Sequence, residues 1–242
     1  MGVGGESEAR RGLVGAFARD LRWSVGAWKI DPRLPLAAFS VSLCEVAFVA
    51  MAHSTAGHIL VLPWIVFFLF FAGFRGVERV WYDRIGLGWD FAWKQVRECN
   101  GDLRSRFICV GIVVFIPLVL LTEPFRHASP AVHYGVAGLA WFVADVLLTF
   151  VTVELALVTS DPGEAIGAGI SLLRTTWPAC ALYALLPPLG LQLVIQSGAG
   201  FGTASRIVGG IVVAPIALAC RGATVRFFDR EVRELSLHTS PT

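Results

Sequence analysis

The sequence predicts an all-α, polytopic membrane protein with six transmembrane helices in three hairpins, each hairpin preceded by an interfacial amphipathic helix. The 242 residues are 55% apolar and only 16% charged, with a mean hydropathy of +0.67, whereas soluble domains hold about 25% charged residues. The apolar residues gather in stretches of about 17–25 residues, the length that crosses a bilayer. Almost all basic residues fall on one side of the spans that these stretches define.

The first predicted unit begins with an amphipathic stretch over residues 9–30. Its apolar positions recur at helical spacing and are Val14, Phe17, Leu21, Val25 and Trp28. Basic residues fill other positions, which is the pattern of a helix that lies in a membrane interface. The hairpin that follows, residues 34–74, comprises the spans Leu34–Ala52 and His58–Phe74.

The second unit repeats this order. Residues 87–103 form its interfacial helix, on which Trp89, Trp93, Val96 and Leu103 share one face. The hairpin covers residues 107–158, with spans Phe107–Thr122 and Val132–Val158. The longer second span has room to tilt in the bilayer.

The third unit starts with a helix signal. In Asp161-Pro162-Gly163-Glu164, Asp161 can cap the helix, proline suits the first turn and Glu164 can close a capping box. The interfacial helix covers residues 161–174 and the hairpin residues 176–223, with spans Thr176–Gln196 and Thr203–Ala223. Residues 224–242 are expected to form a cytoplasmic tail of this one membrane domain, residues 1–242.

Basic residues orient the spans, because cytoplasmic flanks carry the excess of Lys and Arg. With the N-terminus inside, every one of the 20 basic residues except Arg126 and Arg206 falls on the cytoplasmic side. The sequence therefore predicts that both termini are cytoplasmic. The charges fit attraction to anionic membrane lipids and do not indicate nucleic-acid binding.

One arrangement of residues recurs at a constant offset. Arg75-Gly76 followed by Trp81-Tyr82-Asp83-Arg84 returns as Arg221-Gly222 followed by Phe227-Phe228-Asp229-Arg230, and the middle hairpin ends instead in VTSDPGE. The pattern favours an internal repeat. The alternative is convergence on a common membrane exit, where Arg and aromatic residues are usual.

Residues 9–233 resemble uncharacterised six-span integral membrane proteins of actinobacteria and, loosely, the membrane domain of some bacterial glycerophosphodiester phosphodiesterases. The stretches DPGEAIGAGISLLRTTWP and RVWYDR carry this resemblance. It implies the architecture and a place in a bacterial cytoplasmic membrane. It implies no activity, because the catalytic barrel of such fusions is not part of these 242 residues.

Ionisable residues inside predicted spans are functional candidates, because each costs roughly 2.5–3.5 kcal/mol to insert. Glu45 and Asp145 fall near the bilayer middle, and Glu154 lies closer to the cytoplasmic end. Thr149 and Thr152 extend Asp145 into a polar stripe at helical spacing. One interpretation is a proton or cation path along this stripe with Glu45 opposite. The other is that protonated carboxyls hydrogen-bond between helices and hold the bundle together.

Two further groups of candidate residues lie outside the apolar core. The outer side gathers imidazole and carboxylate groups that suit zinc or a similar ion, namely His53, His58, Glu123, His127 and His133. Their spacing matches no known metal motif, so solvated loop histidines are the alternative. The cytoplasmic side offers residues for contact with lipid headgroups or a partner subunit, namely Arg19, Arg22, Trp28, Trp89, Trp93 and Arg97.

No nucleotide-binding or hydrolase motif such as GxxxxGK(S/T), GxGxxG or GxSxG occurs in the sequence. We therefore expect a non-catalytic accessory or scaffold-like membrane protein that works through lipid or partner-subunit contacts and carries no cofactor. The alternative is a permease or permease subunit. It would be either an ABC-type subunit whose helix Trp89–Cys99 couples to an ATPase, or a cation- or proton-coupled carrier that uses Glu45 and Asp145. A lipid-directed enzyme would need a polar cluster at one interface, which only the outer histidines resemble.

Overall fold

The computed structural model describes residues 3–37, 39–40, 74, 76–85, 89–125 and 127–239. These residues form helices and no strand, in the order α1 (Val3–Ile30), α4 (Trp89–Thr122), the short 3-10 helix η3 (Glu123–Phe125), α5 (Pro130–Leu157), α6 (Pro162–Thr175) and α7 (Ala181–Thr239). Residues 76–84 form a further helical segment. The all-α prediction is confirmed for this part of the chain, whereas nearly all of the first predicted hairpin lies outside the described residues.

Three helical segments within the described ranges are long and apolar enough to cross a membrane. They are Asp102–Phe125, Gly135–Leu157 and Ile211–Val232, and Ala181–Gly190 is a shorter apolar stretch. The three segments overlap the third, fourth and sixth predicted spans, and the shorter one overlaps the fifth. Their length and apolar composition are compatible with a membrane protein, while the number of passes stays a prediction.

α4 joins two elements that we expected to be separate. A distinct interfacial helix over residues 87–103 was predicted before the span Phe107–Thr122, but α4 is one helix of 34 residues. Gly101 does not interrupt it, because glycine inside a helix costs only about 1 kcal/mol relative to alanine. Leu103 and Phe107, on either side of the expected boundary, are both buried, so packing holds this part of α4 helical.

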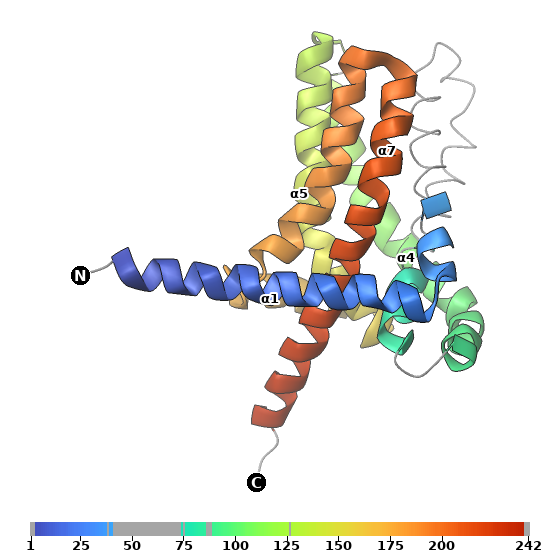
Figure 1. Ribbon diagram of the computed structural model, residues 1–242. Coiled ribbons are helices and arrows are strands. Elements are labelled where there is room, and N and C mark those ends of the chain that lie inside the picture. Colours follow the sequence, from blue (N-terminus) through green and yellow to red (C-terminus); the bar gives the residue numbers. More distant parts are fainter. Residues whose placement is uncertain are drawn as a thin grey trace.

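α7 folds back on itself. A straight helix of 59 residues would extend about 90 Å at 1.5 Å per residue. However, the hydroxyl of Thr224 donates a hydrogen bond to the carbonyl of Tyr183 at 3.2 Å, and the rings of Tyr183 and Phe227 lie 4.5 Å apart. The ascending and descending arms of α7 are the orange and red ribbons of Figure 1.

Part of the stretch after residue 223, which we predicted to be a tail, packs into the core, while its cytoplasmic location stays a prediction. α7 continues to Thr239, and residues 224, 225, 227 and 228 are buried. Phe227 packs against Tyr183 and against Phe150 of α5, with ring centroids 4.5 and 5.7 Å apart. The predicted span ended at Ala223 because charged residues flank the aromatic pair Phe227-Phe228.

The start of α6 follows the predicted signal with one change. The Asp161 carboxylate accepts hydrogen bonds from the backbone N–H groups of Gly163 and Glu164, at 2.6 and 3.0 Å. Glu164 does not close the expected capping box, because its carboxylate instead accepts a hydrogen bond from the Thr159 hydroxyl at 2.6 Å. α6 then packs on α5, where an added Cβ on Gly169 would overlap the backbone of Val151.

α1 runs across α5 and both arms of α7 near the base of the bundle (Figure 1). Its residues Phe17, Asp20, Ser24 and Ala27 are buried. They are spaced three or four residues apart and therefore share one face of the helix. This face lies against α7, as the hydrogen bonds described below show.

Burial recurs along the chain at one constant spacing. Thr149 of α5 lies midway in the sequence between Gly76 and Gly222, the glycines of the two Arg-Gly pairs. The buried positions that follow Thr149 match those that follow each glycine. The matched buried sets are Gly76, Thr149 and Gly222; Val77, Phe150 and Ala223; Glu78, Val151 and Thr224; Trp81, Glu154 and Phe227; and Tyr82, Leu155 and Phe228. α5 thus presents the same buried pattern although its sequence lacks the repeated motif.

Candidate functional site

A buried ion pair joins segment 76–84 to the descending arm of α7. Nε of Arg221 donates to Oε1 of Glu78 at 2.6 Å, and a terminal guanidinium nitrogen donates to Oε2 at 3.3 Å. The Glu78 side chain is 0% exposed and that of Arg221 is 12% exposed. The planar guanidinium therefore grips both carboxylate oxygens, a geometry that fixes orientation as well as charge.

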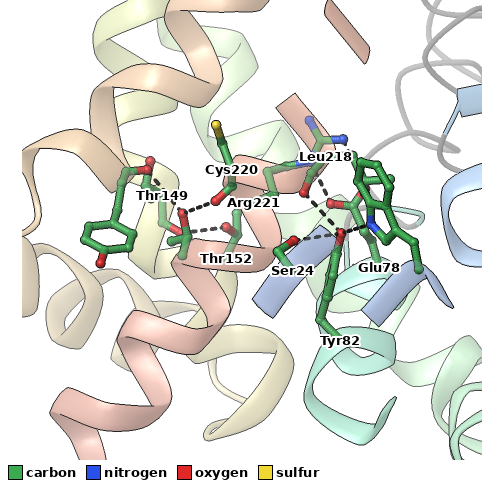
Figure 2. Close-up of polar contacts among 11 residues, drawn as sticks. Ser24, Glu78, Tyr82, Thr149, Thr152, Leu218, Cys220 and Arg221 are labelled. Carbon is green, nitrogen blue, oxygen red and sulfur yellow. Dashed lines mark hydrogen bonds and ion pairs between the residues drawn. The ribbon is translucent and has the colours of Figure 1, made fainter. Parts of the chain in front are cut away.

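The hydroxyl of Tyr82 lies next to this pair and connects three segments of the chain. It accepts hydrogen bonds from Oγ of Ser24 at 3.2 Å and from Nε1 of Trp28 at 2.8 Å, and it donates to the carbonyl of Leu218 at 3.2 Å. Figure 2 shows this hydroxyl at the meeting point of α1, segment 76–84 and α7. Burial raises the pKa of Tyr82 above its ordinary value, so the phenol stays a neutral donor.

Gly222 permits the close contact of α1, segment 76–84 and α7 around the Tyr82 hydroxyl. A Cβ on Gly222 would overlap both Oγ of Ser24 and the ring of Tyr82. The glycine of the repeated Arg-Gly pair therefore lets α1 approach the backbone of α7. Its counterpart, Gly76, lies close to α4, where a Cβ would meet the Phe107 ring at 2.7 Å.

Two further buried carboxylates fasten α1 at separate points. Asp20 accepts hydrogen bonds from the Tyr183 hydroxyl at 2.7 Å and from Arg230 at 3.0 Å, and its side chain is only 4% exposed. Asp31, just after α1, accepts a hydrogen bond from Nε1 of Trp81 at 2.8 Å. α1 is thus bonded through charge to α7 and to segment 76–84.

The intramembrane candidates on α5 are placed as follows. Asp145 is half-buried, and Thr149 and Glu154 are buried. The hydroxyl of Thr149 donates to the Asp145 carbonyl and that of Thr152 to the Thr149 carbonyl, both at 2.9 Å. These hydroxyls are therefore satisfied by carbonyls of their own helix. Glu45 lies outside the described residues, so the path that would pair it with Asp145 stays a prediction.

The outer histidine group is described only in part. Glu123 and His127 are exposed and His133 is half-buried, while His53 and His58 lie outside the described residues. Among the residues that the structure does describe, no three His, Cys, Asp or Glu side chains are close enough together to hold a metal ion. The metal site of the complete set stays a prediction.

The residues that we predicted to contact lipid headgroups or a partner subunit differ in how exposed they are. Arg19 and Arg22 are exposed, as surface contacts require. Trp28 is half-buried, and its indole N–H bonds to Tyr82 inside the fold. α4 includes Trp89, Trp93 and Arg97. The structure describes their backbone but not the surroundings of their side chains.

Sequence reasoning missed the buried polar junction. Its members are Asp20, Ser24, Glu78, Tyr82, Tyr183, Arg221 and Arg230. We counted the arginines as topology signals and did not single out the carboxylates. The available signal was the Arg-Gly pair at the end of a span, because a buried arginine needs an acidic partner.

No protein-family model, curated protein or solved structure matches this chain. Its class is therefore defined by its own geometry. It is an all-α protein with helices able to span a membrane, in which α1 is fastened across the base of the bundle by buried charges.

Removing the Tyr82 hydroxyl is expected to destabilise the protein. Tyr82→Phe should lower the free energy of unfolding by about 1–2 kcal/mol, because Ser24 and Trp28 lose a buried acceptor. Since the folded pKa is raised, the contribution of this group is present below the ordinary tyrosine pKa of about 10 and is lost as the pH rises further. Thermal unfolding in detergent across this pH range measures both effects.

Thr175→Val is the matched control for Tyr82→Phe. The Thr175 hydroxyl bonds to carbonyls of its own helix and is exposed, so its loss should change stability by less than about 0.5 kcal/mol. Equal effects of the two substitutions would show that the Tyr82 junction contributes no particular stability.

Proposed function

We propose that this protein is a non-catalytic integral protein of a bacterial cytoplasmic membrane, and that it serves as an accessory, scaffold-like component through contacts with lipids and partner subunits. The observation that carries the proposal is the use of the buried carboxylates Asp20, Asp31 and Glu78. Each is bonded to another helix or segment of the fold. Such bonds hold helices together and leave contact chemistry to the outer surface.

That outer surface is apolar along the long helices and basic along α1. Only 12% of the apolar window of Asp102–Phe125 is buried inside the protein. Large apolar side chains are exposed on α4 and α5, among them Ile112, Val113, Ile116, Leu120, Leu121, Leu139, Val143 and Leu147. Apolar surface of this extent fits lipid or the helices of a partner subunit.

We also propose the six-span architecture of three repeated units, with both termini in the cytoplasm. The matched buried positions of segment 76–84, α5 and α7 support the repeat, including its middle copy. The one-sided distribution of basic residues supports the orientation. The resemblance to six-span actinobacterial proteins agrees with both proposals.

Co-purification from the native membrane tests the proposed role. The tagged chain would be extracted in mild detergent, and every co-purifying protein and lipid quantified by mass spectrometry. We expect a stoichiometric protein partner or retained lipid, with both reduced by Arg19→Glu combined with Arg22→Glu. Arg104→Glu combined with Arg174→Glu, which changes exposed residues on α4 and α6, is the charge-matched control. A chain that purifies with neither partner nor lipid would overturn the proposal, and an ATPase partner would replace it with a permease subunit.

Proton flux tests the carrier alternative. The purified chain would be reconstituted in proteoliposomes that contain a pH-sensitive dye, and a membrane potential imposed with valinomycin. We expect wild type and Asp145→Asn to insert and fold alike and to give the same proton leak as empty vesicles. A flux in wild type that Asp145→Asn abolishes would replace the scaffold with a coupled carrier.

A further inference from the structure

α1 has two flanks of different chemistry on either side of the face that packs on α7. One flank carries Val14, Leu21, Val25 and Trp28, which are spaced by three, four or seven residues and so lie on one edge of the helix. The opposite flank carries Arg19, Trp23 and Ile30. Val14 and Val25 are 58% and 40% exposed, so the first flank presents apolar surface.

The contacts with α7 show which flank faces the membrane. On the first flank, Trp28 reaches the Tyr82 hydroxyl, which bonds to the carbonyl of Leu218. On the opposite flank, the ring of Trp23 lies 5.3 Å from the guanidinium carbon of Arg226, two turns further along α7. Both residues lie in the apolar segment Ile211–Val232, but the last predicted span ends at Ala223. Leu218 therefore lies inside that span, and Arg226 lies beyond its cytoplasmic end. The flank with Val14 and Val25 therefore faces the bilayer.

Arg22 and Lys29 form the outward edge of the membrane-facing flank. They are two helical turns apart and share a stripe with Val25, which lies between them. Both are exposed. An arginine or lysine placed beside exposed valines can keep its apolar stem along the lipid while its charge reaches the headgroup phosphates. Arg19, on the opposite flank, points its charge instead toward Asp20, with Nε 3.8 Å from Oδ1.

We propose that Arg22 and Lys29, together with Val14 and Val25, are a docking surface for anionic phospholipids of the cytoplasmic leaflet. The basic groups bind the headgroup phosphate, and the valines contact the upper acyl chains. This inference rests on the proposed membrane role and adds the lipid chemistry and the residues that recognise it. The proposal assigns lipid binding to Arg22 and Lys29 and not to Arg19, which lies on the opposite flank of the same helix.

Lipid titration of the purified full chain tests this surface. Binding of phosphatidylglycerol and of phosphatidylcholine would be measured by native mass spectrometry. Arg22→Gln combined with Lys29→Gln should raise the Kd for phosphatidylglycerol by roughly fivefold for each charge removed. Arg104→Gln combined with Arg174→Gln removes the same charge from exposed positions on α4 and α6 and should leave the Kd within twofold of wild type, which is about 0.4 kcal/mol or less. All four positions are exposed, and the variants should retain the thermal unfolding midpoint of wild type.

Each other outcome of the titration overturns the inference in a distinct way. Equal losses in both double variants would show general charge attraction without a docking surface. Equal binding of phosphatidylcholine would show that the phosphate charge is not recognised. Competition by glycerol phosphate at the same concentration as the lipid would indicate a site for a free phosphate. None of these results bears on whether a protein partner co-purifies, so failure here is distinguishable from failure of the proposed function.

Discussion

Glu78→Met is expected to lower the free energy of unfolding by about 3–5 kcal/mol, because Arg221 loses the carboxylate that neutralises it inside the fold. Arg221→Met should have an effect of the same size for the reciprocal reason. The double variant should recover most of the loss, since buried ion pairs exchange for apolar residues of similar volume with little net cost. Equilibrium unfolding in detergent gives the three free energies and the coupling between the two residues.

An exposed ion pair provides the comparison for this cycle. Lys94 and Glu98 lie 3.9 Å apart on α4, with side chains 69% and 52% exposed. Lys94→Met should therefore change stability by no more than about 0.5 kcal/mol. If the double variant at Glu78 and Arg221 is as unstable as either single variant, the two residues do not act as a pair and the junction owes its stability to other contacts.

The elements that the sequence predicted well are those determined by local chemistry. Asp161 caps α6 because a carboxylate before a proline and a glycine satisfies free N–H groups at the helix start. The positions of α1 and α5 follow in the same way from apolar spacing and span length. Local rules also explain why Thr149 and Thr152 bond to their own helix, since hydroxyls in helices commonly donate to carbonyls three or four residues back.

The buried junction could not be predicted in this way because it depends on which helices meet. Windows of hydropathy average Glu78 into a polar flank and Arg221 into the last apolar span, and nothing local indicates that residues so far apart in the sequence form a pair. The same averaging led us to end the third hairpin at residue 223. Phe227 is buried only because Tyr183 and Phe150 are brought to it by the fold.

α1 has a structural role beyond that of a surface anchor. Buried groups tie it to segment 76–84 through Tyr82 and to α7 through Asp20. α6 lies against α5 in the predicted second unit, and α1 lies against α7 in the last one. In the proposed repeat, α1 of the first unit therefore packs on the last unit, just as α6 of the third unit packs on the second. Changes in its packing face are then expected to affect the whole bundle, whereas changes in its outer edge affect only what docks there.

Gly169→Leu tests the close contact between the predicted second and third units and should cost at least about 3 kcal/mol of unfolding free energy. An added Cβ already overlaps the backbone of Val151, and backbone cannot move aside as a flexible side chain can. Gly167→Leu is the matched control on the same helix. A Cβ there meets nothing within 4 Å, so the better helix propensity of leucine should stabilise the protein by up to about 1 kcal/mol.

Thermal unfolding and hydrogen exchange of α6 measure both glycine variants. Gly169→Leu should lower the unfolding midpoint and speed exchange in α6, because the helix has to separate from α5 to admit the larger side chain. Gly167→Leu should do neither. If both variants leave the midpoint unchanged, α6 is not held against α5 at this point, and the repeat would lose the contact that joins its second and third units.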